Sequence, residues 1–117
     1  MSDLEGRSRH NNVRIYGVPE DAEGTSAVTF VENLIKTELG DSLPLDRGRD
    51  LGIERAHRAL APKPPASAPP RSIVVRFLRF SVKEKALNTA WKKELRVQNK
   101  QVFFDHDKTP VRHFLLT

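Results

Sequence analysis

Arginines occur inside two short runs of β-branched and aromatic residues, where the outward positions of a strand usually carry Ser or Thr. The runs span residues 13–18 and 71–80, and their arginines are Arg14, Arg71, Arg76 and Arg79. Successive side chains of a strand point to opposite faces, so Arg14 and Arg76 would lie opposite the apolar side chains of their runs. Guanidinium groups on a sheet face pair with phosphates and stack on planar groups. The pattern therefore predicts a surface that binds a polyanion.

Catalytic and metal-binding patterns are weak by comparison. The chain has no cysteine, and its four histidines are scattered without a His-Glu-x-x-His pair or a nucleophile elbow. Asp105-His106-Asp107 is the candidate metal or nuclease site, but adjacent residues on a strand point to opposite faces and cannot converge on one ion. We therefore expect neither an enzyme nor a cofactor.

The composition is compatible with a nucleic-acid ligand and does not require one. The 117 residues carry a net charge of +5, which is a moderate attraction for a polyanion, and the length predicts one domain. An apolar run long enough to cross a membrane is absent from the sequence, and so is an apolar signal segment at the N-terminus. We expect no membrane association.

The periodicity of the chain alternates between strands and helices. The expected elements are a strand over 13–18, a helix from Thr25 or Ser26 to about Leu39, a strand over 52–58, a strand within 71–80, a helix capped by Ser81 and Glu84 that runs to about Glu94, and a strand over 102–104 in a hairpin with 95–97. This order predicts an α+β, ferredoxin-like βαββαβ fold, with a four-stranded antiparallel sheet and two helices on one face.

The direction of the side chains in the strand over 52–58 is ambiguous. If Ile53 points inward, strict alternation also sends Arg55 and His57 into the core, which is costly without partners. A bulge, or a switch that turns Ala56 inward, would place Arg55 and His57 on the uncovered face. We favour the second arrangement.

The uncovered face of such a sheet is the surface on which RNA-recognition motifs stack bases on aromatic side chains. When the usual third-strand motif is placed so that its last aromatic is Phe77, the two stacking positions become Ser72 and Val74. On the first strand the stacking position becomes Arg14, and Tyr16 remains near the strand's end. These substitutions favour binding through phosphates and guanidinium stacking, with little discrimination of sequence.

Several ordered segments together resemble a known family. They are residues 7–20 (RSRHNNVRIYGVPE), 53–58 (IERAHR), the proline-rich loop over 59–70, 70–77 (PRSIVVRF), 83–87 (KEKAL) and 102–105 (VFFD). Over residues 7–109 the chain is similar to the RNA-recognition-motif domain of the first-open-reading-frame protein of LINE-type retrotransposons, the transposase 22 family.

The resemblance implies a single-stranded RNA ligand, with DNA as a further ligand, and a nucleic-acid chaperone that coats the element's transcript in a ribonucleoprotein particle. It also implies trimers formed through an upstream coiled coil that this chain lacks, and a location in cytoplasmic particles or the nucleus. The family's arginines fall on Arg14, Arg71 and Arg76, and Lys92 and Lys93 are the nearest cations to a helix position occupied by Trp91. The RNA-binding candidates are Asn12, Arg14, Tyr16, Arg55, His57, Arg71, Val74, Arg76, Lys92 and Lys93.

The expected organisation has three parts. Residues 1–11 would be a flexible tail at the end of the coiled-coil region, 12–107 the folded domain, and 108–117 the start of a truncated C-terminal domain. An alternative function is a protein-interaction module that uses the sheet or the proline-rich loop, which holds five of the eight prolines.

Overall fold

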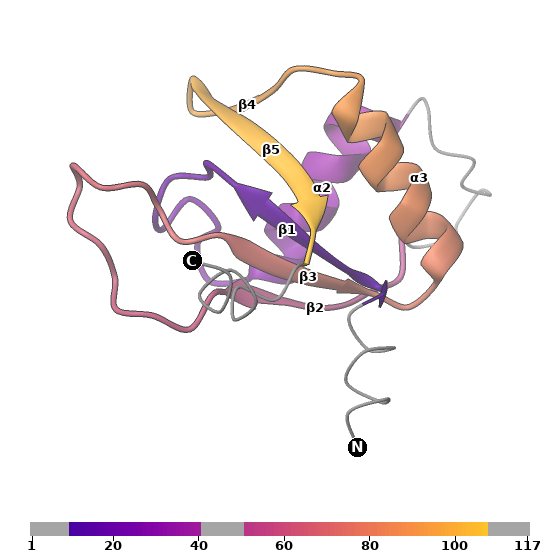
Figure 1. The fold of residues 1–117 in the computed structure, drawn as a ribbon, viewed down its shortest axis with the longest axis horizontal. Helices are drawn as coiled ribbons and strands as arrows, with labels where there is room; N and C mark the ends of the chain where they lie inside the picture. Colours follow the sequence, from indigo (N-terminus) through magenta and orange to yellow (C-terminus); the bar gives the residue numbers. More distant parts are fainter. Residues whose placement is uncertain (1–9, 41–50, 108–117) are drawn as a thin grey trace, which may run out of the picture.

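The computed structural model describes residues 10–40 and 51–107, which form an α+β domain with two helices and a five-stranded antiparallel sheet (Figure 1). In chain order the elements are β1 (Asn12–Tyr16), α2 (Ala27–Leu39), β2 (Ile53–Arg58), β3 (Ile73–Phe77), α3 (Phe80–Trp91), β4 (Leu95–Val97) and β5 (Lys100–His106). The strand order across the sheet is β2-β3-β1-β5-β4, which places β1 and β3 beside each other as expected. Of the expected N-terminal tail over 1–11, residues 1–9 lie outside the described residues, and so does the whole expected extension over 108–117.

The sheet has five strands because the final hairpin contributes two. Gln98 and Asn99 connect β4 to β5 with φ angles of 51° and 66°, the left-handed pair that a two-residue hairpin turn requires. The hairpin itself was predicted, but a four-stranded count is wrong because Leu95–Val97 forms an additional edge strand on β5.

The start of α2 agrees with the sequence-based prediction, whereas the start of α3 does not. The Ser26 hydroxyl accepts a hydrogen bond from the Thr29 amide at 3.2 Å and caps α2 as expected. The capping box at Ser81 is not formed, since α3 begins at Phe80 behind Arg79, whose side chain makes no capping hydrogen bond. This helix is instead held by the apolar face that it buries.

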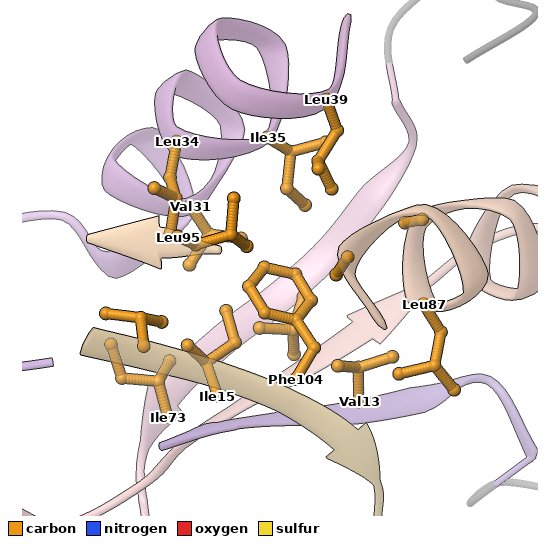
Figure 2. Packing of buried hydrophobic residues seen from close by; sticks show 14 of the residues in the cluster. Val13, Ile15, Val31, Leu34, Ile35, Leu39, Ile73, Leu87, Leu95 and Phe104 are labelled. Atoms are coloured by element: carbon orange, nitrogen blue, oxygen red, sulfur yellow. The ribbon is translucent and has the colours of Figure 1, made fainter. Parts of the chain in front are cut away.

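One apolar cluster lies between the sheet and the two helices, so both helices cover the same face (Figure 2). The strands contribute Val13, Ile15, Ile73, Val75, Phe77, Leu95, Val102 and Phe104, and the helices contribute Val31, Leu34, Ile35, Leu39, Ala86, Leu87 and Ala90. The alternation predicted for the two arginine-bearing strands is confirmed by this burial. Neither α2 nor α3, the helices of the described ranges, has the length and apolar character needed to cross a membrane.

The bulge expected in the strand over 52–58 is present. The register of β2 against β3 shifts between Ile53 and Arg55, after which Ala56 pairs with Val75 and packs against the core. Arg55 then lies opposite Arg76. The same shift turns Arg58 inward, where only 9% of the residue is exposed.

Candidate nucleic-acid interface

The sheet face opposite the helices, here called the open face, gathers seven of the ten predicted binding residues. The strand ladders place Asn12 beside Arg76, and His57 beside Val74. These four side chains and Arg55 line a shallow depression of about 90 Å³, here called the cationic depression. Three strands supply its walls, so it exists only because β2, β3 and β1 are adjacent.

Arg14 lies in the middle of the open face and is held by a carboxylate. Its Nε is 2.8 Å from Oδ1 of Asp107, and its Nη1 donates to the Ser72 hydroxyl at 2.9 Å. Asn12 donates to the other oxygen of Asp107 at 2.9 Å, and the Asp107 side chain is only 9% exposed. A phosphate that approaches Arg14 would therefore have to compete with a carboxylate that two side chains already bind.

Arg55 and Arg76 carry the excess positive charge of the open face. They lie opposite each other across β2 and β3, and Nε of Arg76 is 2.6 Å from Oε1 of Glu54. Arg55 is exposed and, within residues 10–40 and 51–107, makes no hydrogen bond or ion pair. Like charges directly opposite each other on a sheet are unfavourable. Within the described residues the charge of Arg55 is not offset by a carboxylate, and an anion would offset it.

Charge is divided between the two sides of the open face. The β2–β3 side holds the cationic depression, whereas β5 presents Asp105 opposite Arg14, with Asp107 just beyond the strand. A phosphate is therefore attracted to the β2–β3 side and repelled by Asp105 near the C-terminal end of β5.

The exposed end of the β1–β5 ladder is aromatic. Tyr16 pairs with Phe103, and the two residues are 42% and 55% exposed. Tyr16 was predicted as a binding residue, but Phe103 was not. Its position between the buried Val102 and Phe104 was a sufficient signal, because strand alternation sends the residue between two core positions outward.

Arg71 lies outside the cationic depression and joins two loops. Its Nη2 and Nε approach the two carboxylate oxygens of Glu20 at 2.9 and 3.2 Å, and its Nη1 donates to the carbonyl of Ala61 at 2.9 Å. The Glu20 carboxylate also accepts from the Arg71 amide at 2.8 Å. This geometry fastens the proline-rich loop to the segment that follows β1.

The hydrogen bond from the Arg71 side chain lowers the pKa of Glu20 from 4.5 to about 2, against the opposing effect of burial. A carboxyl group whose pKa is lower in the folded state contributes stability that is present above pH 4.5 and is lost as the pH falls towards 2. We expect the stability advantage of the native protein over Glu20→Gln to shrink across this interval. Urea unfolding at pH 7, 4 and 3 measures it. The control is Asp21→Asn, which removes an exposed carboxylate paired with Lys63. An advantage over Glu20→Gln that does not change with pH would contradict the prediction.

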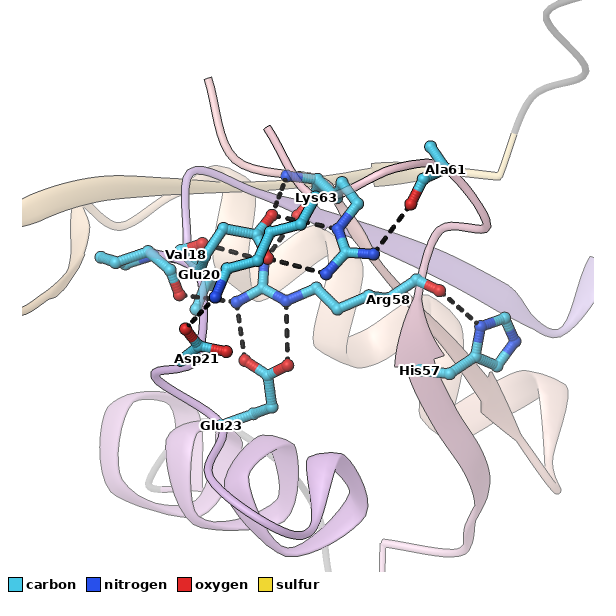
Figure 3. Close-up of polar contacts among 10 residues, drawn as sticks. Val18, Glu20, Asp21, Glu23, His57, Arg58, Ala61 and Lys63 are labelled. Atoms are coloured by element: carbon cyan, nitrogen blue, oxygen red, sulfur yellow. Dashed lines mark hydrogen bonds and ion pairs between the residues drawn. The ribbon is translucent and has the colours of Figure 1, made fainter. Parts of the chain in front are cut away.

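Arg58 is the centre of a buried polar network that sequence reasoning missed (Figure 3). Its Nη2 and Nε bind the two oxygens of Glu23 at 2.7 and 3.0 Å. It also donates to the backbone carbonyls of Val18, Pro19 and Arg71. The network ties the segment after β1 to both ends of the proline-rich loop, and it lowers the pKa of Glu23 through the hydrogen bonds from Arg58.

Lys92 and Lys93 lie in the helix layer, away from the open face. They follow the last residue of α3, and Nζ of Lys93 donates to the carbonyl of Glu38 in α2. With Trp91, they belong to a separate hollow of about 470 Å³ on α3. The structure therefore divides the predicted residues between the open face, the base of the proline-rich loop and the helix layer.

Comparison of the chain with known protein families gives a match. The model of the L1 transposable element RBD-like domain matches residues 10–105, which cover both helices and nearly all of the sheet. No curated protein matches the chain. Within the described ranges, no group of three or more His, Asp or Glu side chains could hold a metal ion.

Proposed function

The chain belongs to the family of L1 transposable element RBD-like domains, and from this premise we propose that it binds single-stranded RNA with little sequence specificity through the open face. The observation that carries the proposal is the cationic depression, in which Arg55 is exposed and has no partner among the described residues. Arginine side chains neutralise phosphates irrespective of the base. Val74 occupies the centre of the face, so a third-strand aromatic for reading bases is missing there.

We also infer that the fold is the ferredoxin-like arrangement of an RNA-recognition motif with one added edge strand. Without β4 the strand order is β2-β3-β1-β5. Helices connect β1 to β2 and β3 to the final hairpin, as in the split βαβ pattern. In that arrangement β1 and β3 are the central strands, and both contribute to the open face.

Replacing Arg55 by glutamine is expected to weaken binding to a labelled single-stranded RNA several-fold and to lower the log–log salt slope by about 0.7, the value for one phosphate contact. The matched control is Lys36→Gln, which removes one charge from an exposed position on α2. Fluorescence anisotropy over a series of KCl concentrations measures both quantities. A larger loss from Lys92→Gln or Lys93→Gln than from Arg55→Gln would place the interface on the helix layer.

Family membership supports broader proposals about the protein's role. We propose that the domain acts without catalysis and without a cofactor, as part of a nucleic-acid chaperone in cytoplasmic ribonucleoprotein particles, with the nucleus as a further location. A depression of about 90 Å³ contacts only a small part of a ligand. Tight binding would therefore require several copies, and trimers formed through an upstream coiled coil would supply that avidity.

Binding of a protein partner is the second candidate function. The proline-rich loop and the segment after β1 enclose a hollow of about 610 Å³, lined mainly by proline and small residues. Its carboxylates are already paired, Glu20 with Arg71 and Asp21 with Lys63. A largely apolar lining favours a peptide over a phosphate.

A further inference from the structure

The open face carries two exposed aromatic side chains whose position the packing of the domain does not explain. Two other exposed aromatics of the described chain have internal partners: Trp91 donates to the carbonyl of Phe104 at 2.8 Å, and Phe80 lies under the ammonium group of Lys83. Tyr16 and Phe103 belong to β1 and β5 but point away from the apolar cluster that those strands bury. Exposed aromatic area on a sheet face is typical of a binding site.

The ladder places these two residues directly opposite each other, and we call them the aromatic pair. Directly opposed residues of antiparallel strands have Cβ atoms about 5 Å apart, so the two rings lie next to each other on one face. Strand alternation puts Arg14 and Asn12 on the same face of β1 as Tyr16. The aromatic pair is therefore about 13 Å from the row that contains Asn12 and Arg76, at about 3.3 Å per residue.

We propose that the aromatic pair is the base-stacking site of this domain, and that unpaired nucleobases stack on Phe103 and Tyr16 while the cationic depression binds the phosphates. This inference rests on the proposed function and assigns a part of the ligand to each side of the open face. The aromatic pair takes the place of the usual stacking positions, which are occupied here by Arg14, Ser72 and Val74. Tyr16 is two residues beyond Arg14 along β1, and Phe103 lies on the last strand.

The charge distribution favours a base over a phosphate at this place. The next open-face residue on β5 is Asp105, two residues from Phe103, whereas Asp107 lies farther along and is bound by Asn12 and Arg14. A phosphate that approaches Phe103 would be repelled by Asp105, whereas a neutral base has an aromatic face that both rings can contact. A strand of a few nucleotides that reaches from the aromatic pair to Arg76 places its bases on the aromatic pair and its phosphates in the cationic depression. Stacking accepts any base, in agreement with low sequence specificity.

The test compares Phe103→Ala, Phe103→Leu, Phe103→Tyr and Tyr16→Ala with the native domain, by anisotropy on a labelled single-stranded RNA. We expect Phe103→Ala to weaken binding at least about fivefold. Phe103→Leu should weaken binding equally, because it removes the π-face on which a base stacks even though it keeps most of the apolar volume. Phe103→Tyr keeps an aromatic ring and should bind like the native domain. None of these changes removes a charge, so the salt slope should not change, in contrast to Arg55→Gln.

An oligonucleotide that carries abasic sites and an oligonucleotide labelled with 2-aminopurine provide the second readout. The native domain should bind the abasic strand more weakly than the complete strand, and it should quench the 2-aminopurine fluorescence. Phe103→Ala should remove both effects, whereas Arg55→Gln should keep the quenching at saturation. Thermal unfolding checks that each variant is folded, as expected for substitutions at a side chain that is 55% exposed.

The outcomes separate this inference from the proposed function. If the native domain binds no RNA, both are wrong. If it binds RNA but makes no distinction between abasic and complete strands, or if Phe103→Ala and Tyr16→Ala bind normally, the stacking site alone is wrong. A change in self-association by the aromatic variants, without a change in RNA affinity, would reassign the aromatic pair to a protein contact.

Discussion

Replacing Arg58 by methionine is expected to lower the free energy of unfolding by about 3–5 kcal/mol, the usual cost of removing one partner of a buried ion pair. The side chains of Arg58 and Glu23 are 7% and 14% exposed. Without the guanidinium, the carboxylate of Glu23 loses both of its charged hydrogen bonds and is left largely out of water. The carbonyls of Val18, Pro19 and Arg71 lose their donor as well. Domains of this size are stable by about 5–15 kcal/mol, so the variant would lose a large share of its stability.

Urea unfolding at pH 7 measures this effect, and two further variants locate its cause. Adding Glu23→Leu to Arg58→Met should recover part of the loss, because the orphaned charge is removed while the three carbonyls stay unsatisfied. Arg96→Met is the matched control, since Arg96 and Glu94 form a pair in which both side chains are more than half exposed. Its expected cost is below about 1 kcal/mol. Equal costs for Arg58→Met and Arg96→Met would show that the buried network stabilises the fold no more than an exposed ion pair does.

The alternation of apolar side chains was sufficient to predict the core and the sidedness of the sheet. Val13 and Ile15 on β1, and Ile73, Val75 and Phe77 on β3, are buried as their spacing required. The bulge in β2 was predictable because strict alternation would have buried Arg55 and His57 without partners. The same reasoning, continued by two residues from Ala56, would have shown that Arg58 points inward.

The ion pairs of the candidate site could not be predicted from sequence, because their partners are far apart in the chain. Arg14 and Asp107 are separated by 93 residues, and Arg71 and Glu20 by 51. Residue type and strand alternation place an arginine on a face, but only the tertiary arrangement shows which carboxylate reaches it. The sequence therefore identified Arg14, Arg71 and Arg76 as equivalent cations, whereas the structure pairs each with a carboxylate.

This pairing changes what mutation of each arginine would report. Removing Arg14 leaves Asp107, which is 9% exposed, with Asn12 as its remaining side-chain donor among the described residues, so a loss of stability would accompany any loss of affinity. Arg71 holds two loops together, and its removal disturbs the proline-rich loop. Arg55 can be removed without leaving an unpaired carboxylate among the described residues. It is therefore the cleanest single probe of phosphate binding on the open face.

Replacing Gly17 by alanine is expected to cost about 3 kcal/mol or more, through two effects that act together. Gly17 follows β1 with φ = +94°, a conformation that side-chain-bearing residues adopt only under strain. A Cβ atom at this position would overlap the backbone carbonyl oxygen of Gln101 on the neighbouring β5. Backbone cannot move aside as a flexible side chain can, so β1 and β5 would have to separate at this end of their ladder.

The control for Gly17→Ala is Gly24→Ala, because Gly24 also has a positive φ, of 65°, but a Cβ there has no atom of the described residues within 4 Å. Its expected cost is the conformational strain alone, about 1–2 kcal/mol. Urea unfolding of the two variants therefore isolates the overlap with Gln101. Equal costs would mean that β5 moves away from the added Cβ atom without a loss of stability.

Gly17 adjoins Tyr16, and Gln101 lies two residues before Phe103. A separation of the strands would thus also spread the aromatic pair, and a folded Gly17→Ala domain should lose the base-dependent part of its RNA binding while its salt slope is preserved.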